Sequence, residues 1–311
     1  WILQTPGRSV SHGRYQYVLD FSRKEVVDCI YEMMAKLLAE ARISYIKWDM
    51  NRSITECYSA ALPADRQGEV FHRYILGVYD LYERLTSNFP EVLFESCASG
   101  GGRFDPGILY YAPQGWASDD SDAVERLKIQ YGTSMCYPIS SIGAHVSVTP
   151  NHQVFRNTPL HTRANVAYFG TFGYELDLNK LTDEEIEQVK SQISFMKEYR
   201  EIIQFGTFYR LKSPFENNET IWQVVSEDKK TSLVGWYRVL NGVNMPYTRI
   251  QLRGLLEDTL YENVENGTEN YGDELMNLGL LTSDVTAGEI LSGKTPCTDF
   301  DSRIYVLKAK E

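Results

Sequence analysis

The sequence predicts an α/β fold in two parts: a (β/α)8 TIM-type barrel missing its first strands over residues 1–205, followed by a C-terminal antiparallel β-sandwich over residues 206–311. Two observations support this prediction. Strand-like and helix-like segments alternate through the first part, which is typical of parallel strands covered by helices. Short alternating strands with turn residues between them make up the second part, which is typical of a small sandwich.

The first part contains six strand-like segments. They are expected at residues 15–20, 43–48, 91–96, 115–118, 142–150 and 172–176. Two of the intervening helices begin at capping boxes, Ser22–Glu25 and Thr182–Glu185, in which Ser or Thr is followed three residues later by Glu. The other helices are expected over residues 65–88, 122–135 and 162–169.

Six strands are fewer than a closed barrel needs. An eight-stranded barrel usually takes about 250 residues, so we expect its first strands to lie outside this sequence. The first residue is Trp1 and not Met, and no signal peptide follows it. We therefore expect the sequence to be a fragment, inactive or nearly inactive by itself.

The second part contains five short segments of alternating hydrophobicity. They are expected to form strands at residues 220–225, 231–239, 248–252, 258–261 and 302–307. Antiparallel strands joined by short turns bury one face each, so we expect them to pack as a small sandwich.

Composition restricts the possible partners. The 311 residues carry 31 basic and 42 acidic side chains, for a net charge of −11. This acidity argues against nucleic-acid and anionic-membrane partners and is compatible with an enzyme acting on neutral substrates. No apolar run is long enough to span a bilayer.

The cysteines and histidines predict neither disulfides nor metal. Five cysteines occur without a CxxC pair, namely Cys29, Cys57, Cys97, Cys136 and Cys297. An odd, scattered set argues against a disulfide framework or a zinc site, so we predict a cytoplasmic protein. The five histidines show no ligand spacing, and no metal or cofactor is predicted.

Three strand ends carry dense polar and charged groups. Residues 43–52 end in Lys47, Asp49, Asn51 and Arg52, residues 91–103 end in a glycine-rich loop, and residues 114–122 end in three acids. Such groups tolerate burial only when they are paired or face a ligand, and barrel strands carry their active sites at these ends. Carboxylates beside aromatic rings suit a sugar.

Two of these carboxylates have the arrangement expected of a glycosidase pair. Asp49 and Asp119 lie 70 residues, or two predicted strands, apart. Retaining glycosidases place two carboxyl groups about 5–5.5 Å apart, and residues two strands apart on one rim can face each other across a pocket. Asp122 is closest to the predicted helix start, and we expect it to cap that helix.

Further residues near these acids are candidates for sugar contacts. Lys47 precedes Asp49 by two residues and shares its strand face, where it could form a structural ion pair or bond a hydroxyl. Asn51 could bond a hydroxyl or close a turn. Gly100 would let the backbone approach a ligand closely, although a triple glycine is equally common in ordinary loops. Cys97, beside it, either packs as a small apolar residue or lines the pocket.

Three motifs in this order closely resemble the α-galactosidases (melibiases) of glycoside hydrolase family 36. They cover residues 47–52 (KWDMNR), 95–105 (ESCASGGGRFD) and 116–126 (WASDDSDAVER), and the stretch 13–23 is similar to the family too. The resemblance implies a retaining mechanism on a barrel with a C-terminal β-domain. It also implies that full-length members carry an N-terminal β-domain and assemble as homo-oligomers.

Carried over by this resemblance, Asp49 is the nucleophile and Asp119 the acid/base. The positions that surround the galactose are Arg14, Lys47, Asn51, Cys97, Gly100 and Trp116. The function implied is retaining hydrolysis of terminal α-D-galactosyl groups in galactosides such as melibiose and raffinose.

Other functions compete with hydrolysis. A galactosyl transferase of the raffinose synthase type would share these motifs, because acceptor choice depends on the pocket edges. A metal-dependent barrel lyase or isomerase would instead use Asp49, Glu95 and Asp119 as three magnesium ligands with Lys47 as base. A non-catalytic sugar-binding product is a third possibility.

Overall fold

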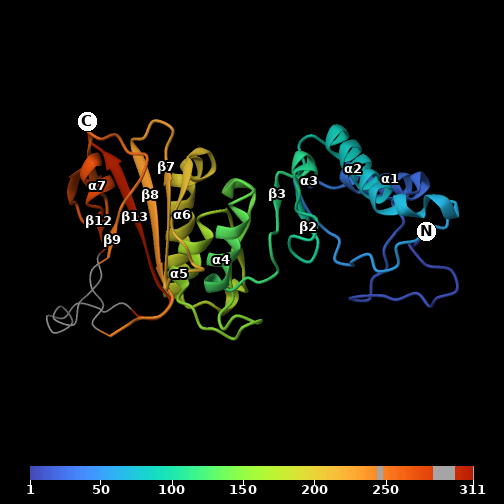
Figure 1. Ribbon diagram of the computed structural model, residues 1–311, viewed down its shortest axis with the longest axis horizontal. Helices are drawn as coiled ribbons and strands as arrows, with labels where there is room; N and C mark the ends of the chain where they lie inside the picture. Colours follow the sequence, from blue (N-terminus) through green and yellow to red (C-terminus); the bar gives the residue numbers. More distant parts are fainter. Residues whose placement is uncertain (244–247, 283–297, 311) are drawn as a thin grey trace. The chain divides into compact units, whose positions relative to one another are not determined.

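The computed structural model describes residues 1–243, 248–282 and 298–310, and Figure 1 shows its elements. It divides into two compact units, Trp1–Asp119 and Asp120–Glu311. In the described part of the chain, no helix combines the length and the apolarity needed to cross a bilayer.

The first unit is built on a small parallel sheet. Its strands β1 (Tyr45–Asp49), β2 (Leu93–Cys97) and β3 (Gln114–Gly115) lie in the order β1-β2-β3. Helix α1 (Lys24–Glu40) precedes β1, the 3-10 helix η1 (Ala64–Glu69) and α2 (Val70–Asn88) connect β1 to β2, and α3 (Pro106–Tyr111) connects β2 to β3. Val27, Val78, Phe94 and Ile108 belong to one buried cluster, so helices and sheet share a core.

The predicted strand at residues 15–20 is wrong. This segment forms only isolated bridges, Gly13 with Gln16 and Ile2 with Leu19. Arg14 and Tyr15 both have positive φ angles, of 53° and 59°, a left-handed backbone that no strand adopts. The alternation of Tyr15, Tyr17 and Leu19 imitates a strand where the chain turns.

The predicted capping box at Ser22 is also wrong. Helix α1 begins at Lys24, and its N-cap Arg23 makes no side-chain cap. The Ser22 hydroxyl donates to Asp20 Oδ1 instead. Asp20 is buried and competes for the hydroxyl that the box requires. The box predicted at Thr182 is confirmed, with both reciprocal bonds to Glu185 present.

The second unit contains a parallel pair followed by an antiparallel sheet. Strands β4 (Gly143–Ser147) and β5 (Thr171–Glu175) pair in parallel. The helices of this part are α4 (Ala123–Thr133), η2 (Ile139–Ser141), α5 (Leu160–Ala167), η3 (Leu178–Lys180) and α6 (Asp183–Phe205).

The antiparallel sheet has six strands in the order β11-β10-β13-β8-β7-β6. In chain order these are β6 (Thr207–Lys212), β7 (Glu219–Val225), β8 (Thr231–Arg238), β10 (Leu260–Asn263), β11 (Glu269–Tyr271) and β13 (Asp301–Ala309). Strands β9 (Arg249–Ile250) and β12 (Leu280–Leu281) form a separate pair, and helix α7 spans Gly272–Asn277.

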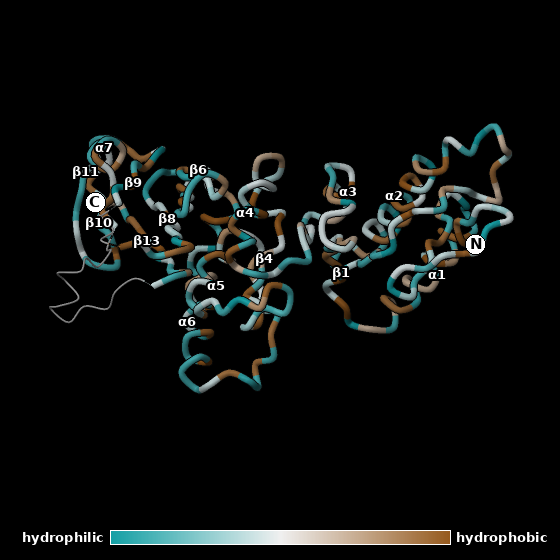
Figure 2. The backbone as a smooth tube through the Cα atoms, turned by 60° about the horizontal axis from the view of Figure 1, so that its bottom comes forward, coloured by the Kyte–Doolittle hydropathy of each residue, from teal (hydrophilic) through white to brown (hydrophobic). Residues whose placement is uncertain are grey.

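Each face of the six-stranded sheet has its own core. On one face Trp222 and Tyr237 pack with residues of α5 and α6, which run along the sheet in Figure 1. On the other face Trp236 packs with Ile250 and Leu280 of the β9–β12 pair. Figure 2 shows hydrophobic and hydrophilic stretches interspersed along the tube. The predicted antiparallel C-terminal part is confirmed, whereas β6, β11 and β12 were missed.

Candidate active site

The carboxyl ends of β1 and β2 lie side by side. Their parallel register pairs Lys47 with Glu95 and Asp49 with Cys97. Strand β3 continues the sheet, because Ser96 pairs with Gly115. The first two polar strand ends therefore lie side by side, and the strand that precedes Asp119 belongs to the same sheet.

Asp49 is the last residue of β1, and its side chain is exposed. Asn51 Nδ2 donates to Asp49 Oδ2 at 2.6 Å. The buried thiol of Cys97 also lies beside this carboxylate: burial, together with its hydrogen bond to Asp49, raises the pKa of Cys97 to about 11. Cys97 is thus a neutral donor, and Asp49 is held by two neighbours that leave its negative charge unneutralised.

Ser99 links Asn51 to Arg14. Its backbone N–H donates to Asn51 Oδ1 at 3.0 Å, and its hydroxyl donates to the Asn51 carbonyl at 3.0 Å. Arg14 Nη1 donates to the Ser99 hydroxyl at 3.4 Å. The structure therefore brings Arg14, Asn51 and Asp49 into one hydrogen-bonded chain.

Gly100 connects the hydrogen-bonded group of Arg14, Asn51 and Asp49 to the strand end that carries Asp119. Its φ is +81°, and a Cβ added there would lie 2.7 Å from Ser118 Cα and 2.9 Å from the Asp119 nitrogen. Only glycine fits both the backbone angle and the space. The loop 98–102 therefore contacts Asn51 through Ser99 and the backbone of Asp119 through Gly100. Asp119 itself is exposed.

Lys47 and Trp116 form the remaining part of the site. The Lys47 ammonium lies 4.4 Å from the centre of the buried Trp116 ring. Its ion pair is with Glu95 Oε1, at 3.4 Å. Lys47 shares the strand face of Asp49, as predicted, but the carboxylate that it pairs with is Glu95.

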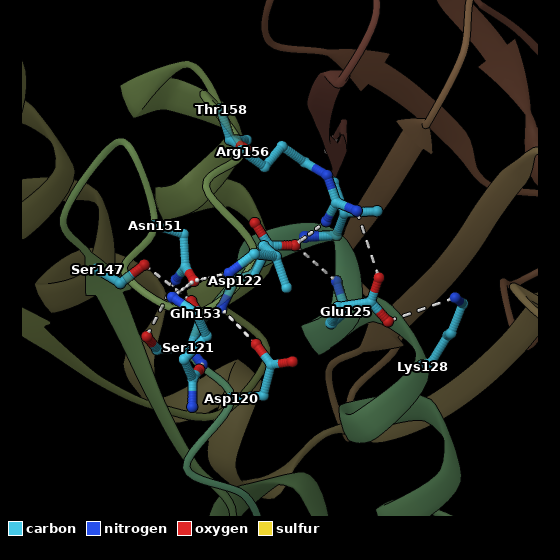
Figure 3. Close-up of polar contacts among 12 residues, drawn as sticks. Asp120, Ser121, Asp122, Glu125, Lys128, Ser147, Asn151, Gln153, Arg156 and Thr158 are labelled. Atoms are coloured by element: carbon cyan, nitrogen blue, oxygen red, sulfur yellow. Dashed lines mark hydrogen bonds and ion pairs between the residues drawn. The ribbon is translucent and has the colours of Figure 1, made fainter.

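Two neighbouring acids belong to local structure. Asp122 caps α4 by accepting from the Val124 and Glu125 nitrogens, both at 3.1 Å, and Arg156 contacts the same carboxylate (Figure 3). The predicted capping role of Asp122 is therefore confirmed. Asp120 Oδ1 accepts from the Asp122 nitrogen at 3.0 Å.

Arg103 and Asp105, in the loop after β2, each have their own partners. Asp105 caps α3 and accepts from Tyr79, while Arg103 Nη1 donates to the Met50 carbonyl at 2.6 Å. A carboxylate that precedes a helix is more strongly satisfied by free N–H groups of the first turn than by a surface cation. Arg103 braces the loop after β1 instead.

Two features of the site were not predicted from the sequence. Ser99 was not singled out, because its positive φ of 51° and its bonds to Asn51 depend on the loop's path. The buried carboxylate of Glu95 was considered only as a metal ligand. In the described ranges, no three His, Cys, Asp or Glu side chains gather so as to hold a metal ion.

Comparison with known proteins identifies the family. The melibiase family model matches residues 1–206, and the model of the glycosyl hydrolase family 36 C-terminal domain matches residues 219–307. The α-galactosidase AgaA of Geobacillus stearothermophilus is 55% identical over 90% of this chain and 38% of its own length. The α-galactosidase Mel36A of Lactobacillus acidophilus is 50% identical over 99% of this chain and 41% of its own length.

The solved structures agree with the family models. The crystal structure of AgaA superposes with a TM-score of 0.93 at 51% identity and covers 100% of this chain and 42% of AgaA. The chain thus spans less than half the length of the relatives it matches. Parallel strands followed by an antiparallel sheet, the carboxylate-bearing strand ends and both family models lead to one conclusion: the chain belongs to the melibiases of glycoside hydrolase family 36.

Proposed function

We propose that this chain is the part of an α-galactosidase that carries both catalytic carboxylates, and that an enzyme of its relatives' length built around it hydrolyses terminal α-D-galactosyl groups with retention. The observation that carries the proposal is the loop 98–102, which contacts the partner of Asp49 at Ser99 and the backbone of Asp119 at Gly100. The named relatives are α-galactosidases, and solved structures of AgaA variants hold raffinose and stachyose. Raffinose and melibiose are therefore the substrates to test first.

The two carboxyl groups divide the reaction into two displacements. Asp49 attacks the anomeric carbon, the glycosidic C–O bond breaks, and Asp119 gives its proton to the leaving oxygen. Water then attacks the galactosyl ester and gives its proton to Asp119, while Asp49 leaves as a carboxylate. Two inversions release α-galactose.

The remaining site residues position the sugar. Trp116 and Lys47 offer an aromatic ring and an ammonium, while Asn51 and the Cys97 thiol orient the attacking carboxylate. Arg14 reaches this group through Ser99, and Gly100 keeps the loop close to Asp119. Preorganised groups of this kind supply much of a glycosidase's rate.

The proposal extends to domains, assembly and location. We place the barrel part in residues 1–205 and the β-domain in residues 206–311, and we expect a cytoplasmic homo-oligomer. The described cysteines Cys29, Cys57, Cys97 and Cys136 are free thiols, which supports a reducing compartment. Cys297 lies outside the described residues. Light scattering and thiol titration test these points.

The decisive experiment follows the anomer that is released first. The 311-residue chain, and the same chain joined behind the residues that precede the matching region of AgaA, are given 4-nitrophenyl α-galactoside in an NMR tube. Early α-galactose supports the proposal, and early β-galactose contradicts it. Turnover that persists in a chelator argues against a lyase or isomerase that depends on magnesium.

Galactosyl transfer is the second candidate, because it uses the same covalent intermediate. Added sucrose would compete with water for the galactosyl ester. A product of raffinose mass that forms faster than free galactose would assign the chain to transfer, and release of galactose alone would assign it to hydrolysis.

A further inference from the structure

Beneath the proposed site, one buried carboxylate joins all three strands of the first sheet. Glu95 of β2 has an exposed side-chain fraction of 1%, and its Oε2 accepts from the Tyr45 hydroxyl of β1 and from Gln114 Nε2 of β3 at 2.8 Å. Its other oxygen, Oε1, is also buried and accepts no hydrogen bond. The Lys47 ammonium lies 3.4 Å from Oε1.

The position of Lys47 follows from this carboxylate. Residues 45, 47 and 49 alternate onto one face of β1, so the Lys47 side chain can lean toward Glu95 or toward Asp49. In the structure it leans toward Glu95 and lies over the Trp116 ring. An ammonium that moved onto Asp49 would neutralise the charge that attacks the sugar.

We propose that Glu95 is a positioning residue: its Oε1 holds the Lys47 ammonium on the Trp116 ring and away from Asp49, so that Asp49 keeps its full charge for attack. This inference rests on the proposed function, because it names how one residue of that site is held. Glu95 does not touch the substrate and acts only through Lys47.

The proposal implies a dependence on pH. Burial raises the pKa of Glu95 to about 7, although the hydrogen bond from the Gln114 side chain acts to lower it. The charged and titratable groups around it are Tyr45 and Lys47 on β1 and, beyond Lys47, Asp49 and the Cys97 thiol. Near neutral pH, protonation of Glu95 would therefore release Lys47 toward Asp49.

The first test compares kcat/KM across pH for the parent, Glu95→Gln and Glu91→Gln, each joined behind the residues that precede the matching region of AgaA. Glu91 is an exposed carboxyl on the same segment and serves as the matched control. The ratio of parent to E95Q should rise about tenfold between pH 5.5 and pH 8, because other ionisations cancel in the ratio. The ratio of parent to E91Q should stay flat. A flat ratio for E95Q in an active enzyme would overturn the proposal.

The second test needs no turnover. Lysines are methylated with ¹³C-formaldehyde, and the Lys47 signal is assigned by its loss in Lys47→Arg. Its chemical shift should change with an inflection near pH 7 in the parent and in E91Q, and this inflection should vanish in E95Q. The same inflection in E95Q, or none in the parent, would overturn the proposal.

The two tests also separate the two proposals. A parent protein joined behind those residues of AgaA that shows the Lys47 inflection but no galactoside turnover contradicts the proposed function and supports the Glu95–Lys47 pair. If E95Q fails to fold by circular dichroism, Glu95→Asp replaces it. The shorter carboxylate should weaken the pair and displace the Lys47 inflection, and an unchanged inflection would again count against the proposal.

Discussion

Asn51 uses both ends of its side-chain amide to connect Asp49 with the glycine loop. The nitrogen donates to the Asp49 carboxylate, and the oxygen accepts from the Ser99 backbone. An amide with both ends satisfied has one favoured orientation. The proposed nucleophile is therefore fixed by contacts to backbone and loop, although its own side chain is exposed.

Removal of Asp49 is expected to abolish turnover without unfolding the chain. In Asp49→Ala, the rate should fall on the order of 10⁴-fold or more, because the attacking group is lost. Azide should partly restore turnover of an aryl galactoside by direct attack, and a single displacement would give β-galactosyl azide. Mass spectrometry and NMR identify that product.

Asp65→Ala, which removes an exposed carboxylate from the same unit, serves as the control and should keep parental activity. If D49A keeps more than about a hundredth of the parental rate, Asp49 cannot be the nucleophile.

Asp119 is expected to matter most for poor leaving groups. In Asp119→Ala, hydrolysis of melibiose should fall far more than hydrolysis of 4-nitrophenyl α-galactoside, because a nitrophenolate leaves without a proton and general acid catalysis contributes roughly 10²–10⁴-fold. Initial rates on the two substrates check this. Equal losses on both would remove the acid role from Asp119.

At the residue scale, the sequence identified the groups but not their contacts. Asp49 and Asp119 stand in recognisable motifs at strand ends. The pairing of Lys47 with Glu95 depends on the β1–β2 register, and the bonds of Ser99 depend on a left-handed backbone. Register and positive φ at a non-glycine residue are set by tertiary contacts, which no single segment contains.

At the element scale, the loop 98–102 is the part of the fold that least tolerates change. Gly100 combines a φ of +81° with backbone atoms below 3 Å from any added Cβ, and a Cβ at Gly101 would lie 2.8 Å from the Ala117 carbonyl. The loop therefore packs on residues 117–119 by backbone contact, which fixes the strand end that carries Asp119.

Gly100→Ala is expected to lower both stability and activity. The left-handed angle alone costs an alanine roughly 1–2 kcal/mol, and the clash with the Ser118 backbone adds to this. We expect a loss of about 2 kcal/mol or more in the free energy of unfolding, measured in urea. The value of kcat/KM should fall with it.

Gly68→Ala is the matched control, because a Cβ there meets nothing within 4 Å and the residue lies in η1. It should be neutral or slightly stabilising. Equal effects of the two substitutions would show that the loop is not constrained as described.

The elements that the sequence predicted well have strong periodic patterns. Helix α2 buries Val70, Tyr74, Val78, Leu81 and Leu85 at helical spacing. Residues 15–20 failed because a strand needs a neighbour, and the segment finds only isolated bridges. Strand β6 was missed because it follows α6 directly, with one glycine between them.

At the scale of the whole molecule, two carboxyl groups with shifted pKa values make stability depend on pH in opposite directions. Side-chain hydrogen bonds from Arg66 and Arg73 lower the pKa of Glu69 to about 2. The contribution of Glu69 to the free energy of unfolding is present above its unfolded pKa of 4.5 and is lost as the pH falls through 2. The Glu69 side chain is 41% exposed, so solvent screens its ion pairs and its effect is small.

Glu95 acts in the opposite direction. Its folded pKa of about 7 lies above the ordinary value of 4.5, because burial disfavours the charged form. The contribution of Glu95 to the free energy of unfolding is therefore fully present below pH 4.5 and is lost as the pH rises through 7. The limit of this loss is about 3 kcal/mol.

The free energy of unfolding should accordingly fall between pH 5 and pH 8 in the parent chain, and Glu95→Gln should remove most of that fall. A neutral amide has no proton to lose, so its burial costs the same at both values of pH. Urea unfolding at the two values, followed by circular dichroism, measures the difference. Glu91→Gln should behave as the parent does, because its carboxyl is exposed. If E95Q and the parent lose the same stability between pH 5 and pH 8, Glu95 is not the buried group that titrates there.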